Sequence, residues 1–414
     1  MKYDLIIIGL GPAGQKLALE ANKRNKKVLV FEKNKAGGTC LNVGCIPTKA
    51  ILNDIKTSSW EECIIRKNNI VSKFNSAIEK DFEKRGIQII KGEATLDYLN
   101  KKVIYKNQEY CADKIVIATG SEPFEIKGLE FDHQNILSSD DIFNLEKLPK
   151  SIAIIGSGAI GIEWTRILNS KGIETFVIEA KEHLLPQMDI DISKRIERIF
   201  KINKIKYFTN TVAMSFKNGI LELSTGETIN VEKVLVAVGR KKLFPKCLQE
   251  DILKINDDFT TNYKDIYSIG DTTNYPMLAH SATHQAEMLA LNLYENKNIK
   301  TDFLIPSVIY GEPEIASVGI KEQDINKENY EIYNMPILAL PKAWCDNQTE
   351  GFIKIIAKDN LIKGAHIISK EASSLLTSVM VAMENNVTID NFRKIIFPHP
   401  TLSEGLSQVF DFKK

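Results

Sequence analysis

The feature that most constrains the fold is a strand–turn–helix–strand unit close to the start of the chain. The apolar run 5–8 leads into the glycine turn GLGPAG, an amphipathic helical stretch follows, and a second apolar run ends at Glu32. Gly9 permits the tight turn, Gly11 lets backbone N–H groups approach a pyrophosphate, and Gly14 lets the helix pack closely on the strand. The helix N-terminus offers free N–H donors, and Glu32 can accept hydrogen bonds from ribose hydroxyls. The unit predicts a dinucleotide site in an α/β fold.

The same unit occurs a second time, with the turn glycines Gly156, Gly158 and Gly161 and a terminal Glu179. In both copies the first glycine and the acid are 23 residues apart. One glycine turn is weak evidence, but two complete units with the same offset are strong evidence for two dinucleotide sites, between which electrons can pass. The Glu179 carboxylate accepts from a ribose 2′-hydroxyl and repels a 2′-phosphate. We therefore expect the second site to prefer NAD(H) over NADP(H).

A cysteine pair follows the first unit, in the stretch GGTCLNVGCIPTK at 37–49. Cys40 and Cys45 lie in a glycine-rich turn and can close a small disulfide ring. The apolar residues that follow have helix character, so Cys45 is expected near a helix N-terminus, where a thiolate is favoured. Lys49 would lie one turn further along. Zinc needs four ligands and no second pair is near, so the pair predicts redox chemistry and no metal site.

Composition sets broad limits. The 414 residues suit two to four domains, and a net charge of +1 gives no overall field that would favour nucleic acid or a membrane. The sequence shows neither a membrane span nor a signal peptide, and six cysteines in a chain of this length do not make a disulfide scaffold. We expect a cytoplasmic protein.

Taken together, these residues make the chain similar to the pyridine-nucleotide-disulfide oxidoreductase family, and within it most similar to the enzymes that oxidise dihydrolipoamide with NAD+. The stretch 37–49 is highly specific to that family, and its other markers follow in the expected order along essentially the whole chain. They are IATGS at 117–121, VAVGR at 236–240, IGD at 269–271, MLAH at 277–280 and HPTLSE at 399–404.

The resemblance implies an architecture of two Rossmann-like nucleotide-binding domains and a C-terminal α+β dimerisation domain. The FAD-binding domain would comprise 1–148 and 266–304, the NAD-binding domain 149–265, and the dimerisation domain 305–414. A homodimer is implied, because one subunit alone would lack a complete site.

The resemblance also implies residue roles. Cys40 and Cys45 would form the redox disulfide, Lys49 and Glu163 would brace the flavin, and His399 would be the acid/base that faces the partner's disulfide, oriented by Glu404. The FAD-binding residues would be Gly9, Gly11, Gly14, Glu32, Gly38, Thr39, Lys49, Ala94, Thr119, Gly120, Asp271 and Ala279. The NAD-binding residues would be Gly156, Gly158, Gly161, Glu179 and Gly239.

The implied reaction is the FAD-dependent oxidation of a protein-bound dihydrolipoyl dithiol by NAD+. The lipoyl partner would be a separate chain, of the 2-oxoacid dehydrogenase or glycine cleavage type. Another NAD(P)H-dependent disulfide reductase, glutathione-reductase-like or acting on another small disulfide, stays open. In the family, helices in the region corresponding to 56–85 help to shape the substrate channel. The charged helical segment 56–85 of this chain, with Phe74, Ile78 and Phe82 on one face, is shorter than theirs, so the resemblance does not define the disulfide substrate.

Overall fold

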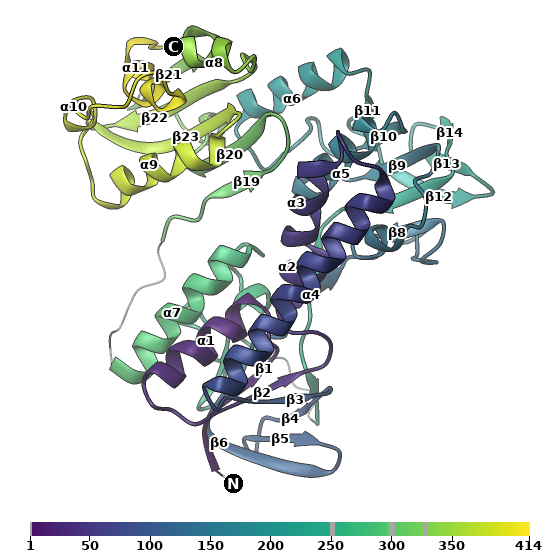
Figure 1. Cartoon of the computed structure of the whole chain (residues 1–414), viewed down its shortest axis with the longest axis vertical. Helices are drawn as coiled ribbons and strands as arrows, with labels where there is room; N and C mark the ends of the chain where they lie inside the picture. The colour runs from purple at the N-terminus through teal and green to yellow at the C-terminus, as the bar shows by residue number, and fades with distance from the viewer. Residues whose placement is uncertain (1, 249–252, 296, 298–302, 327–328) are drawn as a thin grey trace. The chain divides into compact units, whose positions relative to one another are not determined.

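The chain folds into two compact units, shown by a computed structural model that describes residues 2–248, 253–295, 297, 303–326 and 329–414 (Figure 1). The first unit comprises Met1–Phe124 and Arg240–Phe303, and the second comprises Glu125–Gly239 and Leu304–Lys414. Each unit contains one copy of the glycine-turn motif. The three-domain division stays a prediction, and residues 296 and 298–302 of its return segment lie outside the described residues.

The first unit is built on an eight-stranded sheet of order β17-β4-β5-β6-β1-β2-β3, in which β18 also pairs with β6. Strands β6, β1, β2 and β3 run parallel, while β4, β5 and β6 pair antiparallel. The run Leu5–Ile8 is buried throughout, as expected for a parallel strand that is covered on both faces. The strands are β1 (Lys2–Ile8), β2 (Val28–Glu32), β3 (Gln88–Lys91), β4 (Thr95–Asp97), β5 (Lys102–Tyr105), β6 (Gln108–Ile117), β17 (Lys246–Cys247) and β18 (Ile266–Ser268).

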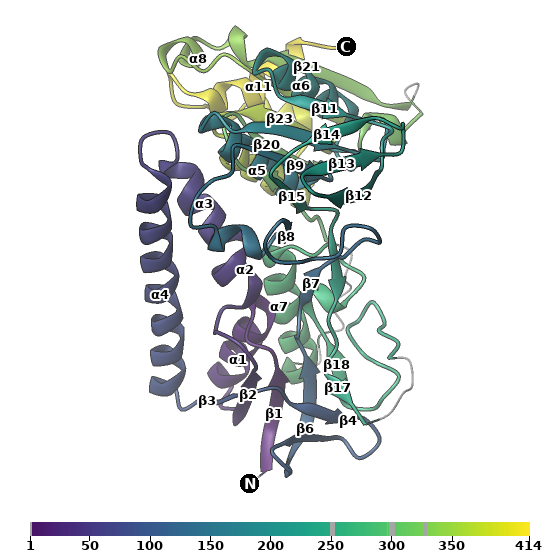
Figure 2. The ribbon, with the colours of Figure 1, turned by 90° about the vertical axis from the view of Figure 1, so that its right-hand side faces the viewer.

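Helices cover this sheet and carry the cysteine pair. Helices α1 (Pro12–Lys23) and α7 (Ala279–Glu295) lie side by side (Figure 1). Helix α2 (Gly38–Val43) is followed by α3 (Cys45–Asp54), and both lie against the long helix α4 (Trp60–Lys84) (Figure 2).

Helix α4 confirms the charged helix expected within 56–85. Ser59 starts it with a capping box, in which its side chain accepts from the Glu62 N–H and its own N–H donates to the Glu62 carboxylate. Of the three residues expected on the apolar face, only the last is fully buried. Phe82 is fully buried, Ile78 is half-buried and Phe74 is 53% exposed.

The second unit begins with a five-stranded parallel sheet of order β11-β10-β9-β15-β8. Helix α5 (Ala159–Ser170) follows its glycine turn, and α6 (Ile190–Ile202) follows later in the chain. A small antiparallel sheet lies between β11 and β15 in the sequence. Its strands are β12 (Ala213–Lys217), β13 (Ile220–Leu223) and β14 (Thr228–Asn230). The parallel strands are β8 (Ile136–Ser138), β9 (Ser151–Ile155), β10 (Glu174–Ile178), β11 (Lys206–Phe208) and β15 (Lys233–Val236).

The C-terminal part of the second unit is an antiparallel sheet of order β19-β20-β23-β22-β21. Its strands are β19 (Ser307–Ile309), β20 (Glu314–Gly319), β21 (Glu331–Pro336), β22 (Phe352–Lys358) and β23 (Leu361–Ser369). Helix α9 (Ala372–Glu384) packs on β23 and β20. The α/β class is thus confirmed. No helix in the described part of the chain is long and apolar enough to cross a membrane.

Candidate functional site

The first glycine turn packs closely between the end of β6 and the start of α1. Gly9 has φ +107°, and a Cβ atom there would collide with the carbonyl oxygen of Ala118 at the end of β6. A Cβ atom at Gly14 would collide with the carbonyl oxygen of Gly9. Helix α1 begins after Gly11 without a side-chain cap, so its first N–H groups are available to a phosphate.

Glu32 closes this turn from the end of β2. Its buried carboxylate accepts from Leu10 N at 2.7 Å and from Asn34 N at 2.8 Å. A carboxylate has about four lone-pair sites, so each oxygen keeps one for a ribose hydroxyl. The acid is therefore held in place by the backbone before any ligand binds.

The second turn repeats this construction in the other unit. Gly156 has φ +97°, and a Cβ atom there would lie 2.7 Å from the carbonyl oxygen of Ala237. The buried Glu179 accepts from Ser157 N at 3.0 Å and from Ser157 Oγ at 2.6 Å. At Gly158, which precedes the uncapped α5, a Cβ atom would meet nothing within 4 Å. That open space is where a pyrophosphate would approach.

The cysteine pair lies at the junction of two helices. Gly44 ends α2 and precedes α3, which places Cys45 at the first residue of α3 and confirms its expected helix N-terminal position. Lys49 lies one turn along the same helix. The Cys40 thiol hydrogen-bonds to the Cys45 side chain, and this contact, together with burial and repulsion by Cys45, raises the pKa of Cys40. In the reduced pair the thiolate is therefore expected on Cys45, where the helix dipole favours negative charge.

The segment that carries the cysteines packs directly against the first glycine turn. Gly38 has φ +57°, and a Cβ atom there would lie 2.7 Å from Gly11 Cα. No larger residue fits at this contact without moving one of the two segments. The two sulfurs are therefore anchored beside the turn expected to hold the flavin dinucleotide.

Sequence reasoning missed a polar network in the first unit. Arg240 donates from Nε to Ser121 Oγ at 2.9 Å, and from Nη2 to Ser121 O at 2.9 Å and Thr39 Oγ1 at 3.4 Å. Ser121 Oγ in turn donates to Asp271 Oδ2 at 2.6 Å. The network thus connects the residue before Cys40 to an expected FAD ligand. One signal was available, because Ser121 and Arg240 each directly follow the glycine of a matched motif, at 117–121 and 236–240.

His399 and Glu404 lie together in the second unit. His399 Nδ1 is 2.9 Å from Glu404 Oε1, and Glu404 Oε2 accepts from Thr401 N at 2.9 Å. The Thr401 N–H and the imidazole lower the pKa of Glu404, so it stays ionised at neutral pH. The His399 side chain is largely exposed, with 70% of its area accessible. Because Nδ1 faces Glu404, the other ring nitrogen, Nε2, points away from this carboxylate.

The other expected residues fall in both units. Glu163 is buried on α5 of the second unit and accepts from Tyr310 N at 3.0 Å, whereas Lys49 belongs to the first unit. Thr119 Oγ1 donates to Leu243 O, Ala94 is buried, and Ala279 is the first residue of α7. At Gly120 and Gly239, as at Gly158, a Cβ atom would meet nothing within 4 Å.

These features fit two dinucleotides. Each turn combines uncapped helical N–H groups with a fixed carboxylate, which are the groups that hold pyrophosphate and ribose. The second turn adds open space at Gly158. The first turn would hold FAD, because the cysteines adjoin it. The second would hold NAD(H).

Comparison with known proteins agrees with this interpretation. Residues 3–286 match the pyridine nucleotide-disulphide oxidoreductase family, and residues 305–410 match the dimerisation domain of that family. A dihydrolipoyl dehydrogenase of Mycoplasma genitalium is 32% identical over 99% of this chain and 98% of its own length. A dihydrolipoyl dehydrogenase of Bacillus subtilis is 31% identical over 98% of this chain and 97% of its own length.

Solved structures show the same architecture. The HOCl-induced flavoprotein disulfide reductase RclA from Escherichia coli superposes with a TM-score of 0.91 at 25% identity, covering 99% of both chains. LpdA from Mycobacterium tuberculosis superposes with a TM-score of 0.88 at 22% identity, covering 98% of both chains. The fold expected from the sequence, with its C-terminal dimerisation domain, is thereby confirmed.

Proposed function

Because the chain belongs to the pyridine nucleotide-disulphide oxidoreductase family, we propose that it acts as a dihydrolipoyl dehydrogenase, which oxidises a protein-bound dihydrolipoyl dithiol with NAD+. Family membership makes it a flavoprotein disulfide oxidoreductase that uses FAD and NAD(H). The observation that carries the proposal is the Cys40–Cys45 contact at the N-terminus of α3, anchored against the first glycine turn.

The substrate assignment is supported by the relatives and by the second acid. Relatives matched over 97–98% of their own length carry the name dihydrolipoyl dehydrogenase at 31–32% identity. Glu179 is buried and already accepts three hydrogen bonds, from Ser157 N, Ser157 Oγ and Lys181 N. These bonds hold the carboxylate in position beside the place expected for the ribose. A 2′-phosphate would be repelled there, which supports NAD(H).

The cysteines supply the bond that breaks and re-forms. A substrate thiolate attacks Cys40 Sγ of the oxidised pair, the Cys40–Cys45 bond breaks, and Cys45 leaves as a thiolate. The second substrate thiol then attacks the mixed disulfide, so the substrate departs as a disulfide and both cysteines are left reduced. The raised pKa of Cys40 retains a proton on that sulfur, while α3 stabilises the Cys45 thiolate. FAD held at the turn of Gly9, Gly11 and Glu32 would supply the two-electron relay from the reduced cysteines to NAD+.

His399 would accept the proton of the substrate thiol. Its Nδ1 is engaged by Glu404, which fixes the ring and leaves Nε2 as the nitrogen that removes a proton from the attacking thiol. In the dimer that we propose, His399 of the partner subunit faces the cysteine pair. The dimerisation domain matched at 305–410 supports this assembly. The lipoyl group would be presented by a separate protein of the 2-oxoacid dehydrogenase or glycine cleavage type.

The alternative is a reductase of another disulfide, supported by the likeness to a flavoprotein disulfide reductase. One pair of assays on FAD-loaded enzyme separates the two: dihydrolipoamide with NAD+, and glutathione disulfide with NADPH. We expect turnover in the first and little in the second. Turnover of glutathione disulfide with NADPH, together with no turnover of dihydrolipoamide, would overturn the proposal.

A further inference from the structure

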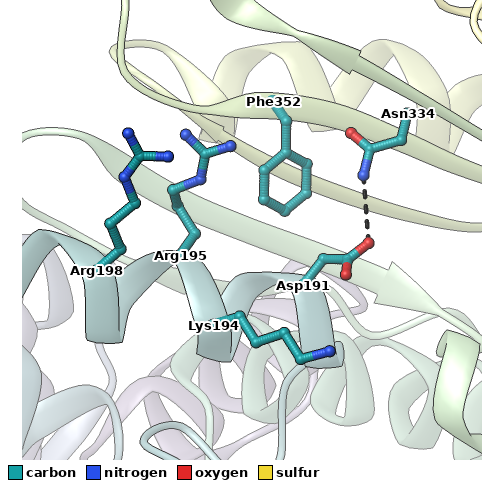
Figure 3. A pocket seen from close by; sticks show the side chains of 6 residues that line it. All are labelled: Asp191, Lys194, Arg195, Arg198, Asn334 and Phe352. Atoms are coloured by element: carbon teal, nitrogen blue, oxygen red, sulfur yellow. Dashed lines mark hydrogen bonds between the residues drawn. The ribbon is translucent and has the colours of Figure 1, made fainter.

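A small pocket lies between α6 and the antiparallel sheet of the second unit (Figure 3). Its volume is about 260 Å³. One face of α6 supplies four of its side chains at helical spacing, and β21 and β22 supply the other two. The lining residues are Asp191, Lys194, Arg195, Arg198, Asn334 and Phe352.

The lining carries three cations against one acid, Asp191, which belongs to an ion cluster that Lys354 and Lys414 form with Asp189, Asp191 and Glu322. Asp191 Oδ2 is 2.9 Å from Lys354 Nζ and 3.1 Å from Lys414 Nζ, and it accepts from Asn334 Nδ2 at 3.2 Å. Hydrogen bonds and attraction from the two ammonium groups lower the pKa of Asp191 despite its burial, so it stays ionised and paired. Because Asp191 is held in this cluster, it forms no ion pair with Lys194, Arg195 or Arg198 among the residues that the structure describes.

The cationic side chains of the pocket have N–H donors that remain available to a ligand. Arg195 uses Nη1 for Glu350, at 2.7 Å, which leaves its Nε and Nη2 donors without a partner in the described chain. Lys194 and Arg198 are exposed, and neither forms an ion pair with any residue that the structure describes. Figure 3 shows Arg195 and Arg198 extending from α6 on the same side as Phe352. Two guanidinium groups on one side favour an oxyanion, because their planar forks match phosphate oxygens.

The floor of the pocket limits the size of the ligand. Phe352 is only 3% exposed, and the Arg195 guanidinium lies over its ring at 5.9 Å. No free aromatic face remains for a nucleobase. None of the lining residues belongs to the glycine turn at Gly156 or to Glu179, so the pocket is separate from the residues expected to hold NAD(H).

From this geometry we infer an additional anion site, apart from the two dinucleotide turns, in which the Arg195 and Arg198 guanidinium groups bind a phosphate dianion and Lys194, on the same helix, adds positive charge. The dianion is either inorganic phosphate or the phosphate group of a small monoester. At neutral pH such a group carries a charge of about −1.5 to −2, which matches the two cations that lack acidic partners. The inference goes beyond the proposed function and does not depend on it.

Calorimetric titration of the FAD-loaded enzyme tests the site. NAD+ is kept saturating, so that the dinucleotide turns are occupied, and ionic strength is held constant with chloride. The probes are inorganic phosphate and glycerol 3-phosphate. We expect saturable binding to the wild type, weakened about tenfold or more by Arg198→Gln and by Lys194→Gln. Tighter binding of glycerol 3-phosphate would assign the site to a phosphate monoester, and equal or weaker binding would assign it to inorganic phosphate.

Lys201→Gln is the matched control, because Lys201 is an exposed cation on the same helix that does not line the pocket. Its affinity for both probes should stay within about twofold of the wild type, as expected when screening weakens the effect of exposed charges. Flavin absorbance and Tm confirm that each variant is folded. No binding of either probe, or equal weakening by Lys201→Gln and Arg198→Gln, would overturn the inference.

Discussion

Ser121 Oγ donates a hydrogen bond to Asp271 Oδ2 at 2.6 Å and accepts one from Arg240 Nε at 2.9 Å. Three segments that are distant in sequence meet at this hydroxyl group. Because the guanidinium also reaches Thr39 Oγ1, the orientation of Asp271 and the backbone next to Cys40 depend on one side chain. In the proposed enzyme, Arg240 is a positioning residue for both the flavin and the sulfurs.

Arg240→Leu should therefore weaken FAD retention and lower stability. Hydrogen bonds to a charged group contribute about 1.5–3 kcal/mol, and the variant also leaves Ser121 O without its donor. Flavin release during gel filtration and Tm measure the two effects. The neighbouring Lys241→Leu is the control, since Lys241 only pairs with Glu122 at the surface. If both variants retained FAD equally well, the network would have no role in holding the cofactor.

The sequence predicts the two glycine turns and the helix position of Cys45 because those features depend on short-range geometry. It does not predict the Arg240 network, whose members Thr39, Ser121 and Arg240 are ordinary residue types brought together only by the fold. The apolar face of α4 shows the same limit. Its helical period is evident, but the period does not say which apolar residues other elements cover, and Phe74 is 53% exposed.

The two glycines of the second turn should respond differently to the same substitution. At Gly158, where φ is −69° and the space is open, alanine should leave Tm unchanged yet raise KM for NAD+ about tenfold or more, because a methyl group facing the pyrophosphate costs ~1–3 kcal/mol. At Gly156, alanine should instead destabilise the fold by more than ~1 kcal/mol, given φ +97° and the Ala237 carbonyl. An unchanged KM in Gly158→Ala would place NAD+ elsewhere.

The two cysteines should differ in their spectra. Cys45→Ser should retain FAD but lose dithiol turnover and the long-wavelength absorbance that a thiolate beside the flavin produces. Cys40→Ser should also lose turnover, but the remaining Cys45 thiolate at the N-terminus of α3 should still give that absorbance as pH rises. A pH titration of absorbance in both variants checks the assignment. Absorbance that persists in Cys45→Ser and is absent in Cys40→Ser would reverse the two roles.

The His399–Glu404 pair should control turnover without affecting cofactor binding. His399→Gln should lower kcat by ~10²–10⁴-fold, the usual contribution of a general acid/base. Glu404→Gln should lower it less, because the imidazole remains and loses only its orienting carboxylate. Glu331→Gln, which removes a surface carboxylate paired with Lys413, is the control. Normal turnover in His399→Gln would remove His399 from the mechanism.

The pH dependence of this pair follows from the lowered pKa of Glu404. A carboxyl group whose folded pKa lies below its unfolded value contributes stability above the unfolded value, and loses it as pH falls through the folded one. Glu404 therefore stays ionised at and above its ordinary value of 4.5. As pH falls below 4.5, Tm of the wild type should therefore fall more steeply than Tm of Glu404→Gln, which has no carboxyl group to protonate there. Thermal unfolding across this acidic range checks the prediction, and an equally steep fall in both proteins would contradict it.

A buried lysine in the second unit gives the sharpest test of stability. Lys354 is fully buried on β22, with Nζ 2.7 Å from Asp189, 2.9 Å from Asp191 and 2.5 Å from Glu322. The sequence FIKIIAK predicts a strand but not this burial, which arises because the start of α6 and the segment of Glu322 cover this face of β22.

Lys354→Met should lower stability by ~3–5 kcal/mol, because removing one partner of a buried ion pair leaves uncompensated carboxylates. Thermal unfolding should show a fall in Tm of about 6 °C or more in the transition of the second unit. Lys370→Met is the matched control, since Lys370 faces Asp346 at 3.5 Å on the surface, and such pairs contribute ~0–1 kcal/mol. Equal Tm values for the two variants would show that the carboxylates around Lys354 take up protons or that water enters, so that the buried charge is not what holds this part of the second unit together.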